Sequence, residues 1–292
     1  MSRRRRRDLD GLVQGLRIEY DVVSSGAGPI RIRRYTNPEA TRPVTLVWAH
    51  GGGFVHGDLE MPESHAVAAA VARSGVSVIA VDYSLVPEWP KKERFPDGTL
   101  PGVRYPVPVA EIEDVFRHVV ATADGPVALG GASAGACLAA TAALRLARAG
   151  EAVPTELVLV YGGFHAALPP LPPEIRAGLR GPAGWFAFRA ETIARINRNY
   201  AGSDAAMGEA FPGDQDLAGM PPTLMIDAER DSLRASGSLF ASQLRASGAE
   251  VDYRVVRGGF HGFLNMIGTR AFAEAIDLIT RRLATHAEGA RQ

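Results

Sequence analysis

The chain alternates between short apolar runs of strand length and longer stretches in which apolar residues recur at helical spacing. The runs of strand length cover residues 44–49, 76–81, 127–129, 157–161, 223–226 and 251–256. The helical stretches cover residues 62–73, 109–123, 136–149, 235–246 and 267–284. Buried β-branched runs that alternate with amphipathic helices are typical of a mostly parallel sheet with helices on both faces. The pattern therefore predicts an α/β fold.

Two further β-like segments, residues 17–23 and 30–35, precede this alternation and are joined by a stretch rich in serine and glycine. Such a spacing predicts an antiparallel hairpin and brings the sheet to about eight strands. Four apolar residues before the hairpin fall at helical spacing and predict a short amphipathic helix. They are Leu9, Leu12, Val13 and Leu16.

Two segments interrupt the alternation. Residues 90–108 contain five prolines and a charged stretch, which predicts a long exposed loop. Residues 164–212 open with a cluster of prolines and continue into a helical pattern. An insertion of this length after a strand predicts a cap over the end of the sheet. We expect residues 1–292 to form a single domain.

The charge balance excludes several classes of partner. Lys and Arg total 32, as do Asp and Glu, so the net charge does not favour nucleic acid or a membrane surface.

The single cysteine, Cys137, allows no internal disulfide and no cysteine metal cluster, and we expect it in the core. Residues 3–7 are all arginine, but no continuous apolar segment follows them, so we expect a solvated tail and a cytoplasmic protein.

The sequence Gly131-Ala132-Ser133-Ala134-Gly135 lies between a predicted strand and a predicted helix. In that context a Gly-x-Ser-x-Gly motif forms a sharp turn that projects the serine hydroxyl from the end of the sheet. The small neighbours let the strand and the helix approach each other closely. The motif predicts Ser133 as a nucleophile.

A serine nucleophile needs a base, and the base needs a carboxylate to orient it. His261 directly follows the last predicted strand, and Asp231 follows the strand before it. Both loops open at the carboxyl edge of the sheet, where Ser133 is also expected. Asp227 and Glu229 compete with Asp231 for the role of the acid. Asp231 is favoured because of its position in the loop.

The sequence His50-Gly51-Gly52-Gly53 follows the strand at residues 44–49. Successive glycines present backbone N–H groups that no side chain obstructs. The N–H groups of Gly52 and Gly53, together with that of Ala134, are candidates for an oxyanion hole.

These motifs occur in the order and the approximate spacing of the hormone-sensitive lipase family of α/β-hydrolases, which the chain resembles from about residue 44 to residue 284. The resemblance implies an α/β-hydrolase fold in which Ser133, Asp231 and His261 form a catalytic triad. It implies a structural role for His50 and Gly51, which would order the glycine loop, and it allows a homodimer. The region before His50 is short for this family, so residues 1–16 would form a reduced amino-terminal cap.

The chain departs from the family pattern at two places. Ala132 stands before the nucleophile, where the family often has aspartate. Tyr83-Ser84-Leu85-Val86-Pro87-Glu88 resembles a family segment but has Ser84 in place of its arginine. Any ion pair that this arginine makes in the family is therefore lost here.

The expected activity is that of a serine carboxylesterase acting on short to medium acyl esters, with a small-molecule ester as partner and no cofactor or metal. The candidate residues of the substrate pocket are Phe54, His165, Trp185, Phe186 and Phe263. Two alternatives stay open at this stage. One is a tailoring hydrolase that acts on a bulky natural-product ester, lactone or amide, and the other is a non-catalytic small-molecule receptor on the same fold.

Overall fold

A computed structural model of the chain describes residues 3–40, 42–88, 100–179 and 188–289. Its centre is one eight-stranded sheet with the strand order β1-β2-β4-β3-β5-β6-β7-β8. The strands are β1 (Arg17–Ser25), β2 (Gly28–Thr36), β3 (Thr45–Ala49), β4 (Ser77–Asp82), β5 (Val127–Ala132), β6 (Leu157–Val160), β7 (Thr223–Arg230) and β8 (Val251–Phe260). Each strand overlaps a segment that the apolar pattern predicted, so the expected α/β fold class is confirmed.

The direction of the strands places the loops that matter for function at one edge. β1 and β2 form the predicted antiparallel hairpin, and β2 also runs antiparallel to β4. All pairings from β4 through β8 are parallel. The carboxyl ends of these strands therefore share one edge, and the loops after β3, β5, β7 and β8 meet there.

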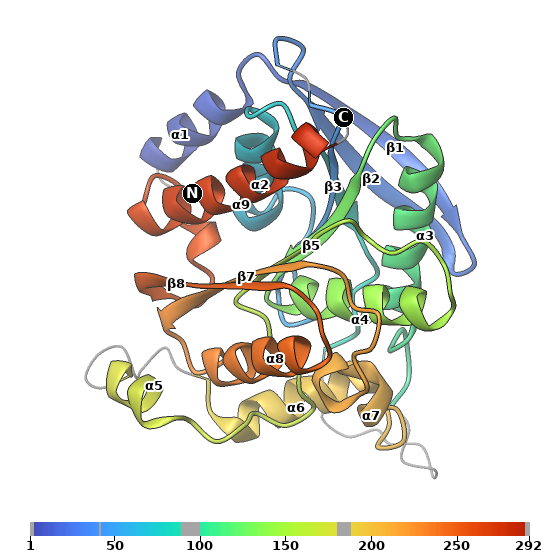
Figure 1. The fold of residues 1–292 in the computed structure, drawn as a ribbon, viewed down its shortest axis with the longest axis vertical. Helices are drawn as coiled ribbons and strands as arrows, with labels where there is room; N and C mark the ends of the chain where they lie inside the picture. The colour runs from blue at the N-terminus through green and yellow to red at the C-terminus, as the bar shows by residue number, and fades with distance from the viewer. Residues whose placement is uncertain (1–2, 41, 89–99, 180–187, 290–292) are drawn as a thin grey trace.

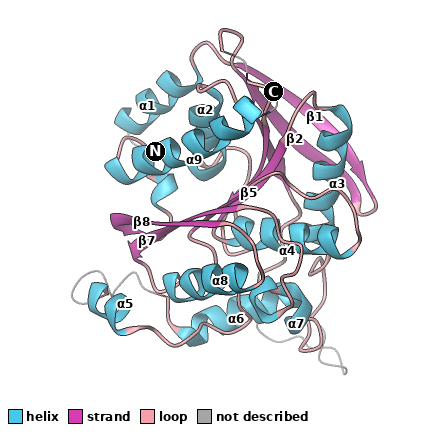
Figure 2. Cartoon of the chain, in the orientation of Figure 1, coloured by secondary structure: helices cyan, strands magenta, loops and turns pink. Residues whose placement is uncertain are grey.

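Helices cover both faces of the sheet, as Figures 1 and 2 show. On one face lie α2 (Pro62–Ala72) and α9 (Arg270–Gly289), with α1 (Arg3–Val13) packed beside α2. On the other face lie α3 (Val107–Thr122), α4 (Ala134–Arg148) and α8 (Arg234–Ala246). Each face has its own continuous apolar core.

Burial explains the composition of the central elements. All five residues of β3 are buried because helices cover the strand on both sides. α2 is buried on nearly all sides between the sheet, α1 and α9, which accounts for its run of alanine and valine. One carboxylate, that of Glu63, is nevertheless buried in the first turn of α2.

The arginine run is helical, and it is solvated where its side chains are described. Helix α1 begins at Arg3 and continues into the predicted amphipathic segment, while Arg6 and Arg7 are exposed. Leu9 and Leu12 of this helix pack against the core under α2 and α9. This contact anchors the helix on the core.

The predicted exposed loop at residues 90–108 is only partly described, because residues 89–99 lie outside the described part of the chain. Its second half is mixed: Gly102, Val103 and Pro106 are exposed as expected, but other residues are not. Leu100 and Arg104 are buried, and the Arg104 guanidinium donates to the backbone oxygen of Asn199 (2.7 Å) and to its Oδ1 (2.6 Å). These bonds to the segment at residues 164–212 explain why a charged residue is buried there.

The segment at residues 164–212 contains α5 (Pro173–Gly178), α6 (Ala190–Ala201), α7 (Met207–Ala210) and a 3-10 turn, η2 (Pro212–Asp214). In Figure 1, α6 and α7 lie next to α8 at the lower end of the molecule. The single-domain organisation and the cap role of this segment stay predictions, as does the reduced cap at residues 1–16. None of the helices in the described part of the chain combines the length and the apolar character that crossing a membrane requires.

Candidate active site

Ser133 is the single residue between the end of β5 and the start of α4. Its backbone has φ 52° and ψ −116°, a conformation that residues with a side chain rarely adopt. A Cβ added to Gly135 would lie 2.2 Å from the carbonyl oxygen of Ala49, and one added to Gly131 would lie 2.4 Å from the carbonyl carbon of Gly135. Only glycine permits this close packing of α4 against the ends of β3 and β5. The packing holds Ser133 in its strained conformation.

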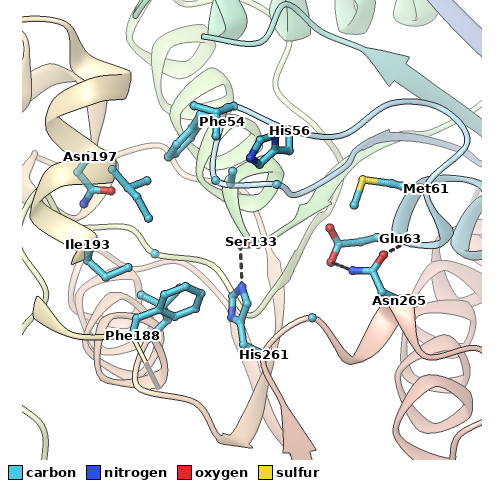
Figure 3. A pocket seen from close by; sticks show the side chains of 18 residues that line it. Phe54, His56, Met61, Glu63, Ser133, Phe188, Ile193, Asn197, His261 and Asn265 are labelled. Carbon is cyan, nitrogen blue, oxygen red and sulfur yellow. Dashed lines mark hydrogen bonds between the residues drawn. The ribbon is translucent and has the colours of Figure 1, made fainter. Parts of the chain in front are cut away.

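Ser133, His261 and Asp231 form a continuous chain of hydrogen bonds. His261 Nδ1 lies 2.7 Å from Asp231 Oδ2, and His261 Nε2 lies 2.9 Å from Ser133 Oγ. Because a carboxylate can only accept, Nδ1 carries the proton and the Nε2 of the neutral imidazole is the acceptor. The Ser133 hydroxyl therefore donates to Nε2, as the dashed line in Figure 3 marks. This is the geometry that base-assisted attack by a serine requires.

The surroundings of His261 change its basicity. Its side chain is 17% exposed, while that of Asp231 is 1% exposed. Burial lowers the pKa of His261 and is the largest single effect, but the charge and the hydrogen bond of Asp231, together with the charges of Glu63 and Asp227, outweigh it. The net result is a pKa of His261 above its ordinary value. Asp231 Oδ1 also accepts a hydrogen bond from the Leu233 N–H at 2.9 Å, which fixes the orientation of the carboxylate.

The two competing acids are engaged elsewhere. Asp227 is buried under α8, and the Tyr253 hydroxyl donates to its Oδ2 at 2.8 Å. Burial raises the pKa of Asp227 to about 8, so this carboxyl is mostly neutral at pH 7. Glu229 Oε2 accepts a hydrogen bond from the Gly258 N–H at 2.8 Å. Of the three candidates, the structure brings Asp231 to His261.

The glycine loop after β3 supplies the candidate oxyanion donors. Gly52 and Gly53 have φ values of 112° and 60°, and both line the same cavity as Ser133 and Ala134. The Ala134 N–H lies in the first turn of α4, where backbone N–H groups have no partner within the helix. The three residues thus line the same cavity as Ser133, and their N–H groups stay candidates for stabilising a developing negative charge.

His50 holds the glycine loop in place. It is fully buried, and its Nδ1 donates to the carbonyl oxygen of Gly51 at 2.7 Å. Its ring stacks on that of Tyr83 with 4.5 Å between the ring centroids, and the Tyr83 hydroxyl donates to the His50 carbonyl oxygen at 2.8 Å. Burial lowers the pKa of His50, so its imidazole is neutral at pH 7. These contacts support the structural role predicted for His50 and Gly51.

Comparisons with known proteins agree with this geometry. A family model described as an alpha/beta hydrolase fold matches residues 46–265. This chain belongs to that α/β-hydrolase family. It is 30% identical over 287 residues to the carboxylic ester hydrolase LipN of Mycobacterium tuberculosis, a match that covers 91% of this chain and 70% of LipN.

Two further similar proteins extend the comparison. The ethyl acetate hydrolase of Pseudomonas putida is 29% identical to this α/β-hydrolase over 283 residues, covering 91% of this chain and 83% of the relative. The structure of an esterase from Pyrobaculum calidifontis superposes with a TM-score of 0.79 at 30% identity, covering 96% of this chain and 89% of the other. The predicted resemblance to carboxylesterases of the hormone-sensitive lipase family is thus confirmed.

The pocket of this α/β-hydrolase has a volume of about 450 Å³ and surrounds Ser133 and His261. Figure 3 shows Phe188, Ile193 and Asn197 on one side of Ser133, and Met61, Glu63 and Asn265 on the other. The remaining lining residues are Gly52, Gly53, Phe54, Val55, His56, Ala134, Gly163, Ile196, Leu233 and Gly262.

The predicted pocket residues differ in where the structure places them. Phe54 lines the pocket as expected. His165 does not line it, because its ring is buried against α8, where it is bonded to Ser236 and Gln243. Phe263 is buried too, with its ring packed edge-on against Tyr161. Trp185 and Phe186 lie outside the described residues.

Sequence reasoning missed a buried polar cluster around Glu63, which is 2% exposed. Glu63 Oε2 accepts from the Gly51 N–H at 2.7 Å. Its Oε1 accepts from the Tyr161 hydroxyl at 2.5 Å and from Asn265 Nδ2 at 3.2 Å. One carboxylate therefore joins the glycine loop, the end of β6 and the turn that follows His261. An acidic residue at the start of an Ala- and Val-rich helix was the sequence signal that could have identified it.

Ser84, which replaces an arginine of the family pattern, makes a different contact. Its N–H and its hydroxyl both donate to the buried Glu111 carboxylate, each at 2.6 Å. The serine at this position is thus bonded to a buried carboxylate of the chain's own core. Among the described residues, no group of three or more His, Cys, Asp or Glu side chains is arranged to hold a metal ion.

We expect kcat/KM for ester hydrolysis to fall as the pH decreases, with its midpoint above 6.5, the ordinary pKa of histidine. The pKa of His261 is raised, and the protonated imidazole cannot accept the Ser133 proton, so activity is lost as the pH falls through that raised pKa. A pH profile of kcat/KM on an uncharged ester measures the midpoint. A midpoint at or below 6.5 would contradict this assignment.

We expect Glu63→Gln to lower kcat by roughly tenfold and to move the midpoint of the pH profile downward, with KM little changed. A glutamine amide presents donors at one end, so at least one buried donor among its three partners loses its acceptor. The substitution also removes a negative charge that raises the pKa of His261.

The matched control is Glu111→Gln, which alters the buried carboxylate bonded to Ser84. It should lower the thermal unfolding temperature and leave the pH midpoint in place. If Glu63→Gln lowers thermal stability but leaves the midpoint of the pH profile unchanged, the role of Glu63 is structural only.

Proposed function

We propose that this protein is a serine carboxylesterase that hydrolyses small esters through an acyl-enzyme on Ser133. The observation that carries the proposal is the unbroken hydrogen-bond chain from Asp231 through His261 to Ser133. The esterase names of the relatives described above support the same activity class. Possession of the fold alone would not decide the function, because one fold hosts many activities.

The geometry suggests how each step proceeds. His261 Nε2 takes the proton as Ser133 Oγ attacks the ester carbonyl, and the N–H groups of Gly52, Gly53 and Ala134 stabilise the oxyanion. Asp231 stabilises the imidazolium that forms. His261 then returns the proton to the departing alcohol, which leaves Ser133 acylated. Water attacks the acyl group in the same way, and the acid and the free serine are released.

The pocket supports a substrate of limited size. A volume of about 450 Å³ falls in the range of small-molecule sites, and its walls include Phe54, Phe188 and Ile193. Short to medium acyl chains suit such a cavity.

The alternative of a non-catalytic receptor is disfavoured, because a receptor has no need for a serine held in a strained conformation beside a base. The tailoring alternative rested on the insertion at residues 90–108, most of which is not described. A cytoplasmic location and a homodimer stay predictions.

We expect Ser133→Ala and His261→Ala each to lower kcat by several orders of magnitude, and the double variant to lose little more, because the two groups act as a unit. A serine-directed fluorophosphonate should label the wild-type protein and leave Ser133→Ala unlabelled. Ser242→Ala, which changes an exposed serine of α8, is the matched control and should keep both activity and labelling. Near-normal turnover in Ser133→Ala would exclude the acyl-enzyme mechanism.

We expect the p-nitrophenyl esters of short to medium fatty acids to give the highest kcat/KM, because the cavity that surrounds Ser133 is limited in volume. A series from acetate to palmitate, measured below the concentration at which each ester forms micelles, provides the comparison. Highest turnover of palmitate would show that the long chain has a binding path other than this pocket.

A further inference from the structure

The side of the pocket formed by α6 carries one polar side chain among apolar ones. Ile193, Ile196 and Asn197 of α6 all line the cavity. Figure 3 shows Asn197 and Ile193 facing the space beside Ser133, with Phe188 below them. Asn197 is 6% exposed, so its amide is removed from bulk solvent. A buried amide in an apolar wall requires partners for its donors and its acceptor.

The orientation of the Asn197 amide is determined by two backbone carbonyls. Its Nδ2 donates to the carbonyl oxygens of His165 and Ala166, each at 3.0 Å. These bonds use both amide hydrogens. The reverse orientation would place Oδ1 against two carbonyl oxygens and is excluded by repulsion. Oδ1 is therefore the free end of the group, and Figure 3 draws it on the Ser133 side.

The carbonyls that fix Asn197 are themselves rigidly held. Gln243 Nε2 donates to the Gly213 carbonyl oxygen at 2.9 Å, so Gln243 Oε1 faces His165 and accepts from His165 Nε2 at 3.0 Å. Burial lowers the pKa of His165, so its Nδ1 carries no proton and accepts from Ser236 Oγ at 2.8 Å, while Ser236 Oγ accepts from the Phe164 N–H at 2.8 Å. His165 thus does not face the substrate, but it positions the carbonyl that orients Asn197.

The Asn197 Oδ1 atom has no hydrogen-bond donor among the residues that the structure describes. A ligand that fills this side with carbon atoms alone would bury the acceptor unpaired, at a cost of about 1–3 kcal/mol. A ligand hydroxyl or amide N–H at the same place would pair with it. A carboxylate there would be repelled, because it offers only acceptors.

We propose that the α6 side of the pocket selects an ester whose acyl or alcohol group is mainly apolar and carries one hydrogen-bond donor, which binds Asn197 Oδ1. The inference rests on the proposed esterase activity and adds the substrate class to it. Asn197 is thereby a specificity-determining residue for an ester with a hydroxyl or amide group, and the donors of the glycine loop stay available for the carbonyl.

The test compares three versions of each ester, which carry at one position a hydrogen, a hydroxyl or a methoxy group. One set varies the position along the acyl chain of p-nitrophenyl hexanoate, and a second set varies it along the alcohol of hexyl acetate. At one position of one set, the hydroxyl ester should exceed its methoxy partner in kcat/KM by roughly tenfold, the value of one hydrogen bond of about 1.4 kcal/mol. The methoxy group keeps the oxygen and cannot donate, so polarity alone does not explain such a difference.

The variant Asn197→Leu should reduce the ratio between the hydroxyl and the methoxy ester to about one. The ratio compares two substrates on the same protein, so a general loss of activity cancels. The matched control is Ile193→Val, which changes the shape of the same wall and should leave the ratio in place. If Asn197→Leu does not fold, the wild-type comparison of the three esters still decides the question.

Equal kcat/KM for hydroxyl and methoxy esters at every position in both sets would overturn the inference, as would a preference that persists in Asn197→Leu. In either case the hydrolysis of the unsubstituted esters would leave the proposed function standing. Failure of the wild-type protein to hydrolyse any ester of the two sets would instead contradict the proposed function, and this inference with it.

Discussion

The hydrogen bond from His261 Nδ1 to Asp231 Oδ2 is the interaction on which the rest of the site depends. It decides which imidazole nitrogen carries the proton, and so makes Nε2 the acceptor that faces Ser133. The two residues directly follow β8 and β7, which are parallel neighbours in the sheet. The pairing register of β7 with β8 shifts between Ala228 and Arg230, so the last residues of β7 before Asp231 are paired irregularly. The distance between base and acid is thus set by backbone pairing.

Strain is concentrated around the same point. Among the described residues, three that are not glycine have a positive φ: Phe54 (68°), Ser133 (52°) and Tyr161 (38°). Phe54 lies in the glycine loop, Ser133 is the proposed nucleophile, and the ring of Tyr161 packs edge-on against that of His261. Backbone conformations of this kind persist only where the surrounding packing imposes them. The Glu63 carboxylate, bonded to Gly51 and Tyr161, joins two of these loops through buried hydrogen bonds.

The two sides of the pocket are organised by different means. On the Glu63 side, the carboxylate and Asn265 satisfy each other, so their polar atoms serve the scaffold. On the α6 side, the amide of Asn197 satisfies its donors on the scaffold and leaves its acceptor to the cavity. Buried Arg104 ties the segment before α3 to Asn199 on the same helix. This arrangement separates the chemistry, which the sheet edge positions, from the recognition of the substrate, which α6 contributes.

The amino-acid sequence by itself determined the strands, most of the helices and the order of Ser133, Asp231 and His261, because burial repeats with a period that local sequence carries. It also identified Gly52 and Gly135 as required glycines, because a side chain at either position would collide with neighbouring backbone. Only the tertiary structure decided that Asp231 rather than Asp227 reaches the imidazole, and that His165 lies behind the wall it was expected to form. It likewise decided that Glu63 is bonded to Asn265, 202 positions away. Such contacts join elements that are distant in the chain. The periodicity of apolar residues indicates which face of an element is buried, but it does not indicate which side chain of another element contacts that face.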